Sequence, residues 1–143
     1  MDKKRILFVA INDYANVLTN WGKAINNYSS NYEAITICLN KSIYYSNDII
    51  ITQKMIIRKR KKHKSIIQKV KEWVNVAEYI ISGYESRDIY KGSDFSILCK
   101  MLKLTYPEIL KSKKISIFHA GSVFRSKHVE IDNIILRYCN HTQ

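Results

Sequence analysis

Proline and glycine are scarce in this sequence, with one and four residues respectively among 143. Because these residues mark turns and loops, their scarcity argues against a loop-rich all-β fold and favours long helices with a few strands. Cysteine is scarce too: Cys38, Cys99 and Cys139 are far apart and form no Cys-x-x-Cys pair. They fit buried thiols in a reducing compartment better than disulfides or a metal site.

Long apolar runs and acidic residues are also few in this sequence. The apolar run after the basic N-terminus covers only residues 6–11, too short for a signal peptide or a spanning helix. Lys and Arg number 24 against 12 Asp and Glu, which gives a net charge of +12. This excess favours an anionic partner, and we expect a cytoplasmic protein, free or held peripherally at the inner face of a membrane.

Strand-type and helix-type patterns alternate along the chain. A strand at 5–11, a helix at 14–28 and a strand at 34–39 make a βαβ unit, and therefore two parallel strands. Further elements are expected as helices at 63–77 and 94–104, strands at 78–82 and 115–118, and a last helix around 131–138. The pattern predicts one α/β domain over 1–143, with an open, mostly parallel, Rossmann-like sheet of four to five strands flanked by helices.

The pattern also predicts the orientation of the first helix and the way the fold ends. The helix at 14–28 is expected to turn its apolar positions toward the sheet, namely Val17, Leu18, Trp21, Ala24, Ile25 and Tyr28. The last helix would normally lead to another strand, and we expect none after it. The chain would then be the opening portion of a larger fold.

Polar residues follow three of the predicted strands. The candidate site residues are Asn12 and Asp13 after the first strand, Tyr84 and Glu85 after the strand at 78–82, and His119, Gly121, Ser122 and Arg125 after the strand at 115–118. Parallel strands bring their carboxyl ends to one edge of a sheet, where ligands of open α/β proteins bind. The alternative is a set of ordinary strand–helix connections whose polar residues satisfy turns and helix caps.

Three segments, 5–13, 77–86 and 118–125, resemble the N-terminal Rossmann-like domain of GT-B glycosyltransferases. The last segment reads Phe-His-Ala-Gly-Ser-Val-Phe-Arg and is similar to bacterial enzymes with His-Gly-Gly-Ser/Thr-x-x-Arg at this strand exit. Ala120 departs from that pattern. The resemblance implies an acceptor-side half of a glycosyltransferase for glycan or glycolipid assembly, inactive alone because the donor-binding domain is absent.

The resemblance also implies roles for single residues. His119 would orient or deprotonate an acceptor hydroxyl, and Arg125 would pair with a diphosphate. Asp13 and Glu85 would hydrogen-bond an acceptor sugar. Each has a structural alternative: a buried or capping histidine, a solvated arginine, a helix N-cap at Asp13 and a solvated loop carboxylate. No cofactor and no metal ion are expected, since the histidines and cysteines show no metal-ligand spacing.

The partner predictions follow from the resemblance and from the basic block at 54–71, which holds nine of the 24 Lys and Arg. We expect a second glycosyltransferase domain or subunit, with a nucleotide-sugar bound only in the complete cleft. An anionic membrane surface is the next partner, and nucleic acid ranks below it because residues 58–64 contain no Phe, Trp or Tyr for base stacking. The alternative function is a non-catalytic binding module that uses this fold and its basic face to hold an anionic partner.

Overall fold

The computed structural model describes residues 2–41, 47–58, 61–83, 93–104 and 113–118, together with the backbone of 141–142. The predicted helix around 131–138 lies outside these residues.

The described strands form one sheet in which every neighbouring pair is parallel. They are β1 (Lys4–Ala10), β2 (Tyr32–Cys38), β3 (Ile49–Ile50), β4 (Tyr79–Gly83), β5 (Lys114–Phe118) and β6 (His141–Thr142), in the spatial order β3-β2-β1-β4-β5-β6. The predicted open, parallel α/β sheet is confirmed in its first five strands. The expectation that no strand follows the last helix is wrong, because β6 pairs with β5 through two residues.

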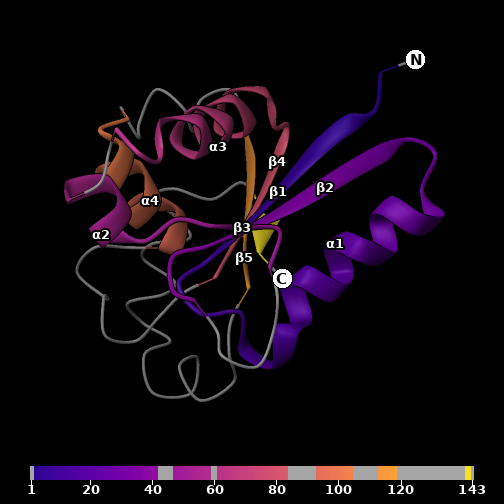
Figure 1. The fold of residues 1–143 in the computed structure, drawn as a ribbon. Helices are drawn as coiled ribbons and strands as arrows, with labels where there is room; N and C mark the ends of the chain where they lie inside the picture. The colour runs from indigo at the N-terminus through magenta and orange to yellow at the C-terminus, as the bar shows by residue number, and fades with distance from the viewer. Residues whose placement is uncertain are drawn as a thin grey trace.

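Helices cover both faces of this sheet (Figure 1). They are α1 (Val17–Tyr28), preceded by a 3₁₀ turn η1 (Tyr14–Asn16), and α2 (Gln53–Ile57), α3 (Lys64–Val76) and α4 (Asp94–Leu102). Helix α1 lies on one face, while α2, α3 and α4 lie on the other. Helix α1 connects β1 to β2, which lies on one side of β1 in the sheet. Helices α3 and α4 lead to β4 and β5, which lie on the other side of β1. Right-handed crossovers then place the two sets of helices on opposite faces.

The larger core lies between the sheet and the three helices α2, α3 and α4. Its strand side chains include Leu7, Val9, Ile37, Ile80 and Ile115, and its helix side chains include Ile67, Val70, Val74, Phe95 and Leu98. In α3 the buried residues recur at three- and four-residue steps, and the buried apolar residues Phe95, Leu98, Cys99 and Leu102 of α4 share one helical face.

Helix α1 differs from its predicted orientation. Trp21 is 46% exposed and Tyr28 is 90% exposed, and Ala24 is exposed as well. The buried residues of the helix are Leu18, Thr19 and Gly22, and Ile25 packs partly buried against the same face of the sheet, as predicted. A Cβ on Gly22 would lie 3.4 Å from Thr36 Oγ1 and 3.8 Å from the Cβ of Ala34, so the helix backbone sits close against β2 at this point.

The small size of residue 22 suits this orientation of α1. A Cβ there would be in ordinary van der Waals contact with β2, so the Leu18–Gly22 side of the helix lies inward at close range. Trp21 then moves to the flank of the helix, where its ring packs edge-on against Phe118 with 5.4 Å between centroids. The prediction that Trp21, Ala24 and Tyr28 lie in the buried face is therefore wrong.

Candidate functional site

The carboxyl ends of β1, β4 and β5 lie next to one another. Val9 is in register with Ser82, and Gly83 is in register with Phe118. The strand order changes direction at β1 and β4, the place where open α/β sheets have their ligand-binding crevice. The meeting of the three strand ends at one edge is thus confirmed for the strands themselves.

Of the predicted site residues, the structure places Asn12 and Asp13. The others lie outside the described residues: Tyr84, Glu85, His119, Gly121, Ser122 and Arg125. In the sequence, Tyr84 directly follows β4 and His119 directly follows β5. Their roles stay predictions.

Asp13 binds the N-terminus of α1. One carboxylate oxygen accepts a hydrogen bond from the Leu18 backbone N–H at 2.9 Å. The other accepts from the backbone N–H of Thr19 at 2.9 Å and from its hydroxyl at 2.6 Å. Between Asp13 and the helix, Ala15 and Asn16 have positive φ angles of 51° and 58°. This left-handed turn brings the chain back so that Asp13 caps the helix from four residues before its start.

The capping role predicted for Asp13 is therefore present, and it has a chemical consequence. In many Rossmann-like domains a ligand phosphate binds at the N-terminus of this first helix. Here a carboxylate of the chain itself accepts from the N–H groups of Leu18 and Thr19. A phosphate would compete with this carboxylate and be repelled by its charge. The first strand–helix turn is consequently a poor place for a nucleotide phosphate.

Asn12 lies half-buried beside the end of β2. Its side-chain oxygen accepts a hydrogen bond from Asn40 Nδ2 at 3.2 Å, and the backbone N–H of Asn40 donates to Ile11 at 3.0 Å. The two asparagines thus join the chain just beyond β1 to the chain just beyond β2. An exposed amide pair at this edge offers both donors and acceptors to a polar ligand.

A buried aspartate that the sequence reasoning did not include among the site residues lies between the ends of β1 and β4. Asp94 begins α4, is 3% exposed, and accepts a hydrogen bond from the Ile11 backbone N–H at 3.0 Å. Ser82 Oγ accepts from the Phe95 backbone N–H at 2.9 Å and donates to the Gly83 carbonyl at the same distance. The first turn of α4 is thereby fastened to both strand ends.

Gly83 has no side chain, and the carboxylate of Asp94 occupies the space that a side chain there would fill. A Cβ at Gly83 would lie 2.5 Å from Asp94 Oδ2 and 3.6 Å from the Val9 carbonyl oxygen. The carboxylate is buried and bonded to Ile11, so it has little freedom to move aside. The inner part of the crevice between β1 and β4 is therefore filled by the protein. A ligand at this edge must bind further out, beyond Asn12 and Gly83.

The thiols of Cys38 and Cys99 lie in the core, and their surroundings make them unreactive. Burial, together with the nearby carboxylates of Asp13, Asp48 and Asp94, raises the pKa of Cys38 to about 12. Burial alone raises the pKa of Cys99 to about 12. The predicted buried thiols are confirmed for these two residues, and neither can serve as a nucleophile at neutral pH.

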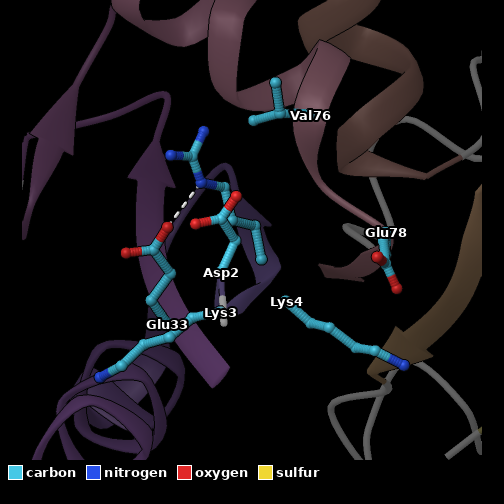
Figure 2. A pocket seen from close by; sticks show the side chains of 7 residues that line it. Asp2, Lys3, Lys4, Glu33, Val76 and Glu78 are labelled. Carbon is cyan, nitrogen blue, oxygen red and sulfur yellow. Dashed lines mark hydrogen bonds and ion pairs between the residues drawn. The ribbon is translucent and has the colours of Figure 1, made fainter. Parts of the chain in front are cut away.

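A hollow of about 600 Å³ lies at the opposite, amino edge of the sheet. Figure 2 shows carboxylates of Asp2, Glu33 and Glu78 around it, with Lys3 and Lys4 extending to opposite sides. Arg5 also lines it and pairs with Glu33 at 2.5 Å. Because charges of both signs line the hollow, it favours no ligand of one charge. It lies away from the predicted site residues.

Other chemistry is not indicated in the described part of the chain. Within those residues, no three or more His, Cys, Asp or Glu side chains are arranged to hold a metal ion. None of the helices found there has the length and hydropathy that crossing a bilayer requires.

The parallel sheet, its order and its ligand-side edge define a Rossmann-like α/β protein. Neither models of known protein families nor curated proteins match the sequence. What this chain shares with known proteins is thus established at the level of the fold.

Proposed function

We propose that this domain forms the acceptor side of the cleft in a GT-B-like glycosyltransferase that acts in glycan or glycolipid assembly. A second Rossmann-like domain, in the same protein or in a partner, would hold the nucleotide-sugar. The observation that carries the proposal is the adjacency of the carboxyl ends of β1, β4 and β5. The segments that resemble GT-B enzymes all include one of these three strand ends.

The chemistry of the first strand–helix turn supports the acceptor side over the donor side. A donor domain must bind a diphosphate, and helix N-termini commonly supply the N–H groups for this. In this chain Asp13 accepts from those groups in α1, and Asp94 places a second carboxylate between β1 and β4. Two negative charges at these positions disfavour a nucleotide and leave a sugar hydroxyl as the better ligand.

The proposal gives His119 and Arg125 distinct roles. His119 takes the proton from the acceptor hydroxyl as the acceptor oxygen forms its bond to the anomeric carbon of the donor sugar. The bond from that carbon to the nucleoside diphosphate breaks, and the diphosphate leaves with the electron pair. Arg125 pairs with phosphate oxygens, for which its planar guanidinium is suited. Asn12, Tyr84 and Glu85 are the proposed contacts to the acceptor.

Calorimetric titration tests this assignment. We expect the chain to bind a short-chain lipid glycosyl diphosphate more tightly than the matching neutral sugar, and Arg125→Ala to remove most of the difference. The loss should be about tenfold or more, since a hydrogen bond to a charged group contributes about 1.5–3 kcal/mol. Lys114→Ala is the matched control, because it removes a cation at the amino end of β5, the strand that leads to the predicted site.

Two results would contradict the proposal. One is an equal effect of Arg125→Ala and Lys114→Ala on diphosphate binding, which would mean that the carboxyl edge has no special role. The other is micromolar binding of a UDP- or GDP-sugar by this chain alone. That result would assign it to the donor side.

The second candidate function is a non-catalytic module that binds an anionic partner. The observation in its favour is the group of exposed basic side chains around the end of α2 and the start of α3, which include Arg58, Lys61, Lys62 and Lys64. Titration with inorganic pyrophosphate beside the glycosyl diphosphate separates the two functions. A binding module has no reason to distinguish a glycosyl diphosphate from other anions of equal charge.

A further inference from the structure

An exposed apolar side chain lies within the basic surface between α2 and α3. Ile57, the last residue of α2, is 70% exposed. The neighbouring Arg58, Lys61 and Lys62 are exposed, as is Lys64 at the start of α3. We call these five residues the basic turn. An isoleucine this exposed beside four cations combines the two properties by which a protein surface binds an anionic bilayer.

The charge of the basic turn is not offset by acidic residues nearby in the sequence. Residues 53–71 contain no Asp or Glu. The first turn of α3 has no acidic residue, and its N-cap residue, His63, makes no side-chain capping hydrogen bond. Cations at a helix N-terminus oppose the helix dipole, so this arrangement does not serve the stability of α3. The basic turn therefore favours contact with anions outside the chain.

The topology places the basic turn on the ligand side of the sheet. Helix α2 follows the carboxyl end of β3, and α3 returns to the amino end of β4. The start of α3 must therefore lie toward the carboxyl edge, about 20 Å from the end of that helix at 1.5 Å per residue. Figure 1 shows α2 on the side of the sheet away from the N-terminus. A surface that contacts the basic turn would thus face the edge formed by β1, β4 and β5.

The side chains of the basic turn favour lipid over nucleic acid. Proteins that bind single-stranded nucleic acid stack bases on aromatic rings, and residues 53–71 contain no Phe, Trp or Tyr. The apolar group that is present, Ile57, is aliphatic and suited to the boundary between lipid head groups and acyl chains. Five further cations occur within 53–71, so the electrostatic attraction extends beyond the basic turn itself.

We propose that the basic turn docks this domain on an anionic lipid bilayer. Ile57 enters the head-group boundary, and the four cations contact lipid phosphates or carboxylates. This docking does not depend on the glycosyltransferase assignment. If both proposals hold, the bilayer would present a lipid-linked acceptor to the carboxyl edge of the sheet.

Co-sedimentation of the full chain with vesicles tests the proposal. We expect binding to vesicles of phosphatidylcholine with phosphatidylglycerol, and little binding to phosphatidylcholine alone. Each basic residue near an anionic surface strengthens binding on the order of fivefold, so Lys61→Gln with Lys62→Gln should weaken it about 25-fold at low salt. Ile57→Ser should weaken it about tenfold, and the Ile57 contribution should persist when salt screens the charges.

The matched control removes the same charge elsewhere. Lys3→Gln with Lys23→Gln replaces two exposed lysines, one at the amino edge and one on α1. Equal weakening by the control and by the Lys61/Lys62 pair would overturn the proposal, because binding would then follow net charge alone. An Ile57→Ser variant that binds as tightly as the unmodified chain would overturn the insertion of Ile57.

Competition decides between lipid and nucleic acid. If single-stranded RNA at the same phosphate concentration removes the chain from anionic vesicles, the docking proposal is wrong. The vesicles carry no sugar acceptor, so their result is independent of the titrations with glycosyl diphosphates. Failure of one proposal leaves the other intact.

Discussion

Two aspartates, Asp13 and Asp94, occupy positions where an open α/β sheet commonly receives the charge of a ligand. Asp13 could be predicted as a cap, because it directly precedes the helix predicted at 14–28. Asp94 could not be assigned to this edge, since its hydrogen-bond partner Ile11 is 83 residues away. Its position depends on where α4 crosses the sheet, and sequence periodicity does not report that.

The two buried thiols should make the protein sensitive to alkaline pH. Folding raises the pKa of Cys38 and of Cys99 from the usual 9.0 to about 12. The stability that comes from keeping each thiol protonated is complete below pH 9.0, and it is lost as pH rises toward about 12 because the unfolded chain ionises first. One pH unit above the unfolded pKa, each thiol should cost about 1.4 kcal/mol.

Urea denaturation across this pH range measures the effect. Replacement of Cys38 and Cys99 by alanine should flatten the fall in unfolding free energy between neutral and alkaline pH, even if the double variant is less stable at neutral pH. Tyrosines and lysines also titrate in this range, and they are the same in both proteins. Parallel pH profiles for the two proteins would show that the thiols ionise equally in the folded and unfolded states.

At the scale of helices and strands, hydrophobic periodicity predicts the buried face of α3 correctly but not that of α1. In α3 the apolar positions Ile67, Val70 and Val74 are all buried, as their spacing indicates. In α1 the helix instead turns Gly22 toward Thr36 and Ala34 of β2, and the larger apolar side chain of Trp21 lies at the flank. Close backbone approach is a property of the pair of surfaces. Hydrophobic periodicity therefore cannot predict it from the helix alone.

The edge of β2 is protected by side chains where β3 is too short to pair with it. β3 pairs with Ile37 and Cys38. Ahead of that pairing, Asn26 of α1 donates to the Ala34 carbonyl at 2.9 Å and accepts from the Ala34 N–H at 2.7 Å. Asp48 accepts from the Thr36 N–H at 2.9 Å. These side chains satisfy backbone groups that would otherwise be open to pairing with another chain.

Asn26 should consequently contribute to stability although its side chain is exposed. Asn26→Ala removes two hydrogen bonds of about 1 kcal/mol each and gains about 0.6 kcal/mol in helix propensity, so a net loss of about 1–1.5 kcal/mol is expected. Thermal or urea denaturation measures it. Asn27→Ala is the control, since this neighbouring asparagine is also exposed in α1 and its replacement should be neutral or slightly stabilising. Equal effects of the two substitutions would mean that the contacts to Ala34 contribute nothing.

For the molecule as a whole, the sheet architecture could be predicted more fully than the site. Strand and helix patterns together with right-handed crossovers lead to an open parallel sheet, and the residues after β1, β4 and β5 then fall at one edge. The filled crevice between β1 and β4 could not be foreseen, because it requires Gly83 to lie against Asp94 from a different element. The expected acceptor site therefore moves outward, toward the residues that follow β4 and β5.

The net charge of +12 predicts how the whole molecule responds to salt. Repulsion among the 24 basic side chains opposes the compact state, so screening should raise the unfolding free energy. We expect a rise of roughly 0.5–1 kcal/mol between about 10 and 150 mM salt, as the Debye length shortens from about 30 to 8 Å. Lys61→Gln with Lys62→Gln should increase stability at low salt and reduce the salt dependence. Lys3→Gln with Lys23→Gln should do so less, because Lys3 has carboxylates around it at the amino edge.

Vesicle binding should show the opposite response and weaken over the same range of salt. An unfolding free energy that falls as salt is added would instead mean that favourable ion pairs outweigh the repulsion.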